Sequence, residues 1–418
     1  MISLIEALNY RCLRYVRQPL GPFHILVGPN ATGKSTFLDV PAFLRDMVTS
    51  GPTEAVFART GNFSDLVWQY EQTGFEVAIE VAIPEEQRNR LDDPKYDTVR
   101  YEVGLALDPD SKQIEIVAEQ GILKVSRASV PRQRTLFPVL RELPETLITG
   151  HSRRGTRRLF SKRHGGNDNY YAEARPKEGR WSPSYRLGPQ KSTLANFPED
   201  EINFPVSTWL KQFLSEGVES VVLNSLRMRR ASPPGLGTRF EPDGSNLPWV
   251  VAELVSRRPE RMGEWVEHLR TALPDLRGIR TVLREDDRHR YLKLRYDCGL
   301  EVPSWVASDG TLRLLALTLI AYVERLKSVY LVDEPENGIH PLAIETMYQS
   351  MSSVYDAQVM MATHSPVLLA IAEPKDVLCF AKTPEGAVDV VPGNEHPRLS
   401  DWKGEVDLGT LFASGVLG

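Results

Sequence analysis

The N-terminal third of the chain alternates apolar and polar residues with a period of two. The clearest alternating stretches are residues 76–83 and 100–107, and residues 113–125 continue the pattern. Such alternation predicts antiparallel strands that bury one face. Other short stretches are apolar throughout, as in strands that are buried on both faces of a parallel sheet. These are residues 23–27, 329–332 and 358–363. Together the two patterns predict an α/β fold with a mixed sheet and an antiparallel β meander.

The strand patterns are interrupted in the middle of the chain. There the apolar spacing becomes helical and loop-rich, with proline and glycine around residues 173–190 and 233–248. We therefore expect a split core: residues 1–130 form its first half, 131–275 an inserted helical and loop lobe, and 276–418 its second half. The chain has no sustained run of apolar heptads, so no long coiled coil is expected.

The first continuous apolar stretch leads directly into Gly28-Pro29-Asn30-Ala31-Thr32-Gly33-Lys34-Ser35, which fits the phosphate-loop pattern GxxxxGK[ST]. A strand, a glycine loop and a helix start present several backbone N–H groups to one anion. Lys34 would add a point charge at the β- and γ-phosphates, and the Ser35 hydroxyl would be a ligand for Mg²⁺. The predicted contacts of ATP in this loop are Asn30, Ala31, Thr32, Gly33, Lys34, Ser35 and Thr36.

The two later apolar stretches end in residues that suit ATP hydrolysis. Asp333 and Glu334 follow the first of them, and His364 follows the second. Because nucleotides bind at the carboxyl ends of parallel strands, these side chains are expected to meet the phosphate loop. Asp333 would hold Mg²⁺ through water, and Glu334 would orient or deprotonate the attacking water. The predicted catalytic residues are Lys34, Glu334 and His364.

Ser308-Asp309-Gly310-Thr311 lies between these motifs and precedes an apolar run, which a capped core helix would explain. The order of the motifs nevertheless resembles that of the ATP-binding-cassette (ABC) ATPases. In this resemblance, residues 308–311 are a divergent SGGQ signature, from which Asp309 and Thr311 depart, and residues 336–341 are similar to the D-loop. The chain resembles the RecF-like and SMC-like branch, in particular the AAA family ATPases of the OLD and Septu kind from anti-phage loci. The supporting motifs are Asn9-Tyr10-Arg11 and residues 28–35, 243–248, 308–317, 332–341 and 362–366.

The resemblance implies further site residues and a partner. In cassette ATPases the signature of one subunit contacts the γ-phosphate bound to the other, so Ser308 and Gly310 would act in trans across a homodimer or a higher even oligomer. Arg11 would contact the nucleotide, although a plain surface arginine explains it equally well. Gln190 is our candidate for the glutamine that senses Mg²⁺, on its position alone.

Composition narrows the class of protein. The three cysteines are widely separated, which favours neither a disulfide framework nor a zinc site. The chain shows neither a signal-peptide pattern nor an apolar stretch of membrane length, so we expect a soluble, cytoplasmic protein with no membrane partner. The net charge of −5 argues against a globally basic nucleic-acid binder, although residues 151–164 carry six Lys or Arg. A docking arm or solvated loop is the favoured interpretation of that segment, and nucleic acid is a possible partner.

The sequence therefore predicts an ABC/SMC-like ATPase that dimerises around ATP and Mg²⁺. It would control a separate effector protein, a nuclease or toxin, in anti-phage defence. The alternatives are a RecF-like DNA-repair ATPase that binds DNA directly, the ATPase subunit of a transporter, and a scaffold that binds ATP without turnover. The long separation of the phosphate loop from the signature disfavours the transporter, and Glu334 disfavours the scaffold.

Overall fold

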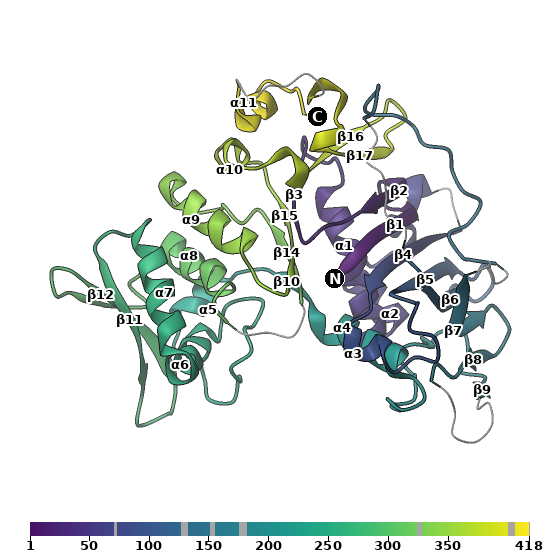
Figure 1. Ribbon diagram of the computed structural model, residues 1–418, viewed down its shortest axis with the longest axis horizontal. Helices are drawn as coiled ribbons and strands as arrows, with labels where there is room; N and C mark the ends of the chain where they lie inside the picture. The colour runs from purple at the N-terminus through teal and green to yellow at the C-terminus, as the bar shows by residue number, and fades with distance from the viewer. Residues whose placement is uncertain are drawn as a thin grey trace.

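The computed structural model describes residues 1–70, 73–126, 133–150, 155–174, 182–323, 328–399 and 406–417. Its strands form an eight-stranded, a six-stranded and a three-stranded sheet. Figure 1 shows the eight-stranded sheet on the right, the six-stranded sheet in the centre and the three-stranded sheet on the left. The predicted α/β fold with an antiparallel meander is confirmed.

The eight-stranded sheet has the order β2-β1-β4-β5-β6-β7-β8-β9, and each neighbouring pair is antiparallel. Its strands are β1 (Ile2–Tyr10), β2 (Leu13–Pro19), β4 (Gly74–Ala82), β5 (Thr98–Leu107), β6 (Ile114–Lys124), β7 (Thr156–Arg163), β8 (Asp168–Tyr170) and β9 (Ser184–Tyr185). The alternating stretches of the sequence thus become β4, β5 and β6. Because β7 to β9 extend the same sheet, the expected boundary at residue 130 does not separate the sheet from a helical lobe.

The six-stranded sheet has the order β10-β14-β15-β3-β16-β17. Its strands are β10 (Val218–Val221), β14 (Val329–Asp333), β15 (Gln358–Ala362), β3 (Phe23–Val27), β16 (Val377–Lys382) and β17 (Val388–Pro392). All neighbours are parallel except β16 and β17. Every residue of β3 and β15 is buried, as expected for continuous apolar strands in the centre of a parallel sheet. The parallel arrangement brings the carboxyl ends of β3, β14 and β15 to one edge.

Each face of the six-stranded sheet belongs to a different hydrophobic core. Leu26 and Met360 share one core with helix α1 (Lys34–Thr49) and the eight-stranded sheet. Ile25 and Met361 point to the other core, which the C-terminal helices fill. Successive side chains of a strand point to opposite faces of the sheet, so β3 and β15 contribute residues to both cores. Helix α1 consequently lies between the two large sheets (Figure 1).

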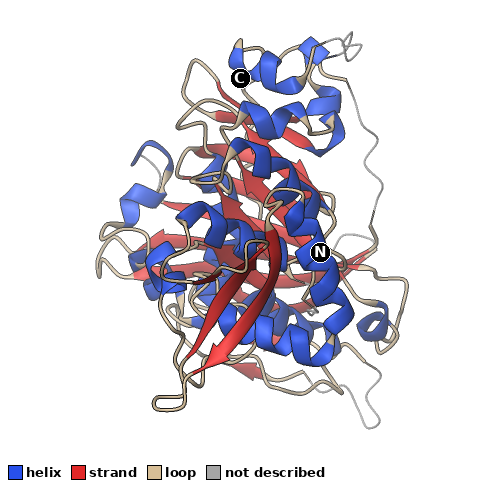
Figure 2. Ribbon diagram, turned by 90° about the vertical axis from the view of Figure 1, so that its left-hand side faces the viewer, coloured by secondary structure: helices blue, strands red, loops and turns tan. Residues whose placement is uncertain are grey.

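The second core is built from the helices that follow β10 and the three-stranded sheet. Figure 2 looks at the molecule from the side on which that sheet lies in Figure 1. Its strands are β11 (Leu276–Leu283), β12 (Arg290–Tyr296) and β13 (Glu301–Pro303). The helices here are α5 (Ser225–Arg229), α6 (Leu247–Arg257), α7 (Pro259–Arg270), α8 (Asp309–Leu319), α9 (Pro341–Ser352), α10 (Pro366–Ala370) and α11 (Leu408–Ala413).

Shorter elements complete the first half of the chain. Helices α2 (Pro52–Phe57), α3 (Glu85–Arg88) and α4 (Pro205–Gly217) lie beside the eight-stranded sheet (Figure 1). Short 3₁₀ turns cover Phe63–Leu66, Trp68–Tyr70, Pro374–Asp376, Gly393–Glu395 and Pro397–Leu399. Among the residues that the structure describes, no helix combines the length and apolar character needed to cross a bilayer.

Candidate functional site

The phosphate loop connects β3 to α1. Gly28 and Gly33 adopt φ of 155° and 89°. A side chain at Gly28 would place its Cβ 2.2 Å from the carbonyl oxygen of Phe380, so the loop packs too closely on β16 for any other residue. Thr32 closes the loop by donating its hydroxyl to the carbonyl oxygen of Pro29, at 2.8 Å. The fold therefore presents this loop at the sheet edge, ahead of the first turn of α1.

Lys34 is the first residue of α1 and its side chain lies over the loop. The ammonium donates to the carbonyl oxygens of Gly28 at 2.8 Å and Pro29 at 3.0 Å. Burial lowers the pKa of this ammonium, and the carboxylates of Asp333 and Glu334 partly offset the effect. The cation is thus held between the loop and the acidic end of β14, where a phosphate would face it.

Ser35 and Asp333 come together as the sequence predicts. The Ser35 hydroxyl donates to Asp333 Oδ2 at 2.6 Å, which joins the start of α1 to the last residue of β14. A hydroxyl beside a carboxylate is an oxygen donor set that Mg²⁺ accepts, with phosphate and water oxygens as its remaining ligands. These two residues therefore fit the predicted metal.

Glu334 leaves the strand in a left-handed conformation, with φ of 48°. Its backbone N–H donates to the carbonyl oxygen of Ala362 at 2.8 Å, so the turn stays attached to β15. The carboxylate accepts a hydrogen bond of 2.5 Å from the side-chain amide of Asn337. These contacts fix the side chain that we expect to orient or deprotonate water.

Glu336 anchors the turn that carries His364. Its Oε1 accepts a hydrogen bond of 2.6 Å from the Thr363 hydroxyl and one of 3.1 Å from the backbone N–H of His364. The loop after β14 and the turn after β15 are therefore connected through one carboxylate oxygen. This connection keeps His364 on the same edge as Glu334.

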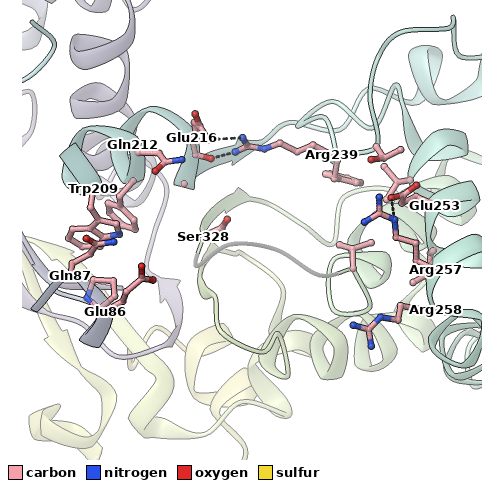
Figure 3. Close-up of a pocket in the computed structure, with 18 of the residues that line it drawn as sticks. Glu86, Gln87, Trp209, Gln212, Glu216, Arg239, Glu253, Arg257, Arg258 and Ser328 are labelled. Carbon is pink, nitrogen blue, oxygen red and sulfur yellow. Dashed lines mark hydrogen bonds and ion pairs between the residues drawn. The ribbon is translucent and has the colours of Figure 1, made fainter. Parts of the chain in front are cut away.

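One cavity of about 640 Å³ collects most of the predicted residues. It is lined by Arg11, Cys12, Asn30, Ala31, Thr32, Gly33, Lys34, Ser35, Thr36, Asp65, Val67, Trp68, Gln69, Tyr70, Asp333, Glu334, His364 and Lys382. A larger cavity of about 720 Å³ lies between α4 and α6 and holds none of the predicted site residues among those described (Figure 3). Chemistry rather than size therefore identifies the smaller cavity as the candidate active site.

Backbone strain gathers around the same cavity. Five lining residues other than glycine have positive φ, namely Arg11 (51°), Ala31 (61°), Gln69 (50°), Tyr70 (60°) and Glu334 (48°). Such conformations are unfavourable for these residue types and concentrate at functional sites. The backbone thus supports the assignment independently of the sequence motifs.

Comparison with known proteins agrees with this geometry. The family described as "AAA domain, putative AbiEii toxin, Type IV TA system" matches residues 168–370. The Smc head bound to the C-winged helix domain of ScpA aligns with a TM-score of 0.55 at 14% identity, over 93% of this chain and 97% of that chain. The chain has the fold of an SMC head. A second Smc head, with an extended coiled coil and bound to the C-terminal domain of ScpA derived from Pyrococcus furiosus, aligns with a TM-score of 0.52 at 13% identity, over 93% and 95% of the two chains. A search of proteins of curated function finds no match.

The SMC-head fold confirms the predicted fold class, and the family match supports an AAA-type ATPase. The finer assignment to the OLD and Septu kind stays a prediction.

Arg11 lies in the turn between β1 and β2 and lines the cavity. Its backbone N–H donates to the carbonyl oxygen of Leu66 at 2.9 Å, and its guanidinium is 3.6 Å from Asp39. The turn is thereby attached to the segment that carries Trp68, Gln69 and Tyr70. Sequence reasoning missed that segment, because nothing in its residues marks it as a cavity wall before the fold is known.

Gln190 does not lie with Ser35 and Asp333. Its side-chain amide donates to Gln113 Oε1 at 2.6 Å, and the carbonyl oxygen of Pro189 accepts the N–H of Ile116. These bonds attach the loop to β6, and Gln190 is absent from the described residues that line the cavity. Gln69 is the glutamine that lines this cavity among the described residues.

The signature residues also lie outside this cavity, as far as the described lining extends. Ser308 caps α8, since its Oγ accepts the N–H of Thr311 at 3.1 Å. Gly310 packs against the loop after β14, where an added Cβ would be 2.3 Å from the carbonyl oxygen of Gly338. Within one chain, residues 308–310 therefore form a capped helix start that lies away from the chain's own phosphate loop.

The described part of the arginine-rich segment belongs to β7, and residues 151–154, which include Arg153 and Arg154, lie outside the described residues. Arg157 donates to the carbonyl oxygen of Ala172. Arg158 donates to the carbonyl oxygen of Gly150 at 2.6 Å. Lys162 is buried against Asp168, with 2.9 Å between Nζ and Oδ1. These cations support the sheet, which weakens the interpretation of this strand as an arm that contacts phosphates.

We predict that Lys34→Ala lowers the affinity for ATP at least about tenfold, because it removes a charge-assisted contact to phosphate. A titration with a fluorescent ATP analogue measures the affinity. Arg45→Ala is the matched control, since Arg45 lies on α1 and makes its contacts with Asp46 and β10. Equal affinity of Lys34→Ala and wild type would remove the phosphate-loop assignment.

We predict that Gly310→Ala destabilises the fold by about 1–3 kcal/mol, because the new methyl group meets a backbone carbonyl that cannot move freely. Gly263→Ala within α7 is the control, because no atom lies within 4 Å of its added Cβ. That control should gain roughly 0.5–1 kcal/mol. Urea unfolding of both variants gives the two free energies, and equal effects would contradict the packing argument.

Proposed function

We propose that the chain is an ATP-binding and ATP-hydrolysing protein that uses Mg²⁺. The observation that carries the proposal is the convergence of Lys34, Ser35, Asp333, Glu334 and His364 on one cavity at the carboxyl edge of the parallel sheet. The SMC-head fold and the AAA-domain match support the same activity. We assign the activity to the cytoplasm.

Each residue has a defined task in this proposal. The loop N–H groups and Lys34 bind and orient the β- and γ-phosphates. Ser35 and Asp333 would hold Mg²⁺, which supplies positive charge to the phosphate oxygens. Glu334 accepts the proton of the attacking water or orients it. His364 lines the same cavity and would contact the γ-phosphate. Phosphate and ADP are the products of the reaction.

We further propose that two copies assemble around ATP. Ser308 and Gly310 do not line the chain's own cavity within the described residues, so their predicted contact with a γ-phosphate requires a second copy. In a two-fold dimer each capped helix start would face the other subunit's phosphate loop.

The output of the ATPase is proposed to be control of a separate effector protein, a nuclease or toxin, in anti-phage defence. Three observations support it: the motif order, the description of the matching family, and the Smc heads, whose own structures contain a bound ScpA domain. Gene neighbourhood tests the defence role, because an adjacent nuclease or toxin gene supports it and an adjacent permease gene contradicts it.

We predict that Glu334→Gln keeps ATP binding but lowers the turnover number at least about a hundredfold, because the amide keeps the shape and removes the base. The variant should accumulate an ATP-bound dimer, which sedimentation velocity detects. Glu345→Gln on α9 is a control, since the Glu345 carboxylate accepts a hydrogen bond of 3.2 Å from Gln349 of the same helix. If Glu334→Gln hydrolyses ATP at the wild-type rate, Glu334 is not the base.

If each ATP site combines the phosphate loop of one subunit with the signature of the other, two inactive variants should complement each other. Ser308→Arg should obstruct the signature while Lys34→Ala disables the phosphate loop. A mixed dimer combines both lesions in one site and leaves the other site intact, so mixing should restore part of the hydrolysis. If sedimentation shows mixed dimers but mixing restores no hydrolysis, the result would contradict composite sites of which one alone can hydrolyse ATP.

A further inference from the structure

The signature of this chain carries the carboxylate of Asp309 at the place where the negatively charged γ-phosphate is proposed to bind. Asp309 stands between Ser308 and Gly310, the two residues that the proposed function puts against a γ-phosphate. Its side chain is 56% exposed, so protein does not shield it from an approaching ligand. A negative charge here opposes triphosphate binding through like-charge repulsion. Some neighbouring group must compensate for it if the turn is to accept phosphate.

Arg229 at the end of α5 supplies that compensation. Its Nη2 lies 2.9 Å from Asp309 Oδ1 and donates to the carbonyl oxygen of Ala307 at 3.0 Å. One guanidinium nitrogen therefore holds both the carboxylate and the backbone just before Ser308. Figure 1 shows α5 beside α8, the helix that Ser308 caps.

The position of Arg229 is itself fixed from several sides. Asn224 caps α5 by accepting the N–H of Arg227 at 3.1 Å. The carbonyl oxygen of Arg229 accepts the hydroxyl of Ser304 at 3.2 Å, which ties the end of α5 to the segment leading into the signature. The guanidinium is thus aimed at the turn by short, local contacts and not by a flexible surface conformation.

We propose that Arg229 is a positioning residue that neutralises Asp309, so that the turn of residues 308–311 can receive the γ-phosphate of ATP bound to a second copy. The proposal rests on the proposed function. The Arg229–Asp309 pair carries no net charge, whereas Asp309 alone would repel the phosphate. The departure from the SGGQ pattern is in this way balanced by a cation from a different element.

A set of three variants tests charge compensation. Arg229→Met should lower ATP-dependent dimerisation and the turnover number at least about tenfold, because it exposes an unpaired carboxylate to the phosphate. Asp309→Asn alone should leave ATP-dependent dimerisation and the turnover number close to wild type or raise them. Arg229→Met combined with Asp309→Asn should recover most of the loss, since the repelling charge is gone.

Arg227→Met is the matched control on the same short helix. Arg227 pairs with Asp243 at 2.7 Å rather than with the signature, so its loss should leave dimerisation and turnover within about twofold of wild type. Arg229→Lys keeps the charge and should retain more activity than Arg229→Met. Thermal unfolding checks that each variant is folded, and the double variant keeps the test decisive if Arg229→Met is less stable.

Titration with a fluorescent ATP analogue separates the possible failures. ATP affinity of the monomer should be unchanged in Arg229→Met, because Arg229 acts on the other copy's nucleotide. If Arg229→Met loses activity and Asp309→Asn does not restore it, Arg229 only supports the fold and the inference is overturned. Wild-type activity of Arg229→Met also overturns it. If wild type itself shows neither hydrolysis nor an ATP-dependent dimer, the proposed function fails first and this inference fails with it.

Discussion

The nucleotide cavity depends on the pairing of β3 with β15, two strands from opposite ends of the chain. Gln358, the buried first residue of β15, sets the start of this pairing. Its Oε1 accepts the N–H of Ile2 at 2.9 Å, and its Nε2 donates to the carbonyl oxygens of Ile2 at 2.8 Å and Gly21 at 2.7 Å. One side-chain amide therefore joins the first strand of the antiparallel sheet, the turn before β3, and β15. A shift of one residue would leave these buried groups unpaired, at a cost of about 1–3 kcal/mol for each, and would move His364 away from the phosphate loop.

The predicted site residues that the structure brings into one cavity include those whose position follows from a strand end. Asp333 and His364 come directly after apolar runs, and Lys34 follows a third run across the phosphate loop. Parallel pairing carries all three to one edge. Their convergence follows from the parallel direction of these strands and from their neighbouring places in the sheet. The same argument explains why the fold class was predictable, since periodicity reports whether one face or both faces of a strand are buried.

The misplaced residues depend on loop paths, which local sequence does not report. Gln190 was chosen by its place along the chain, yet its loop is bonded to β6, while Gln69 reaches the cavity through a turn of left-handed residues. Similarly, β7 to β9 fall within the segment where helical spacing and proline and glycine predicted an inserted lobe. Lys162 shows the cause: its charge is buried against Asp168, so a strand is stabilised where composition indicates a solvated segment.

The loop after β14 touches three parts of the molecule within a few residues. Glu334 lines the cavity, Glu336 holds the His364 turn, and the carbonyl oxygen of Gly338 meets Gly310 of the signature helix. Each contact fixes a different point of the same short backbone. Insertions and deletions should therefore be absent from this loop in any functional relative, even where its side chains vary, because a change in length would release at least one of the three attachments.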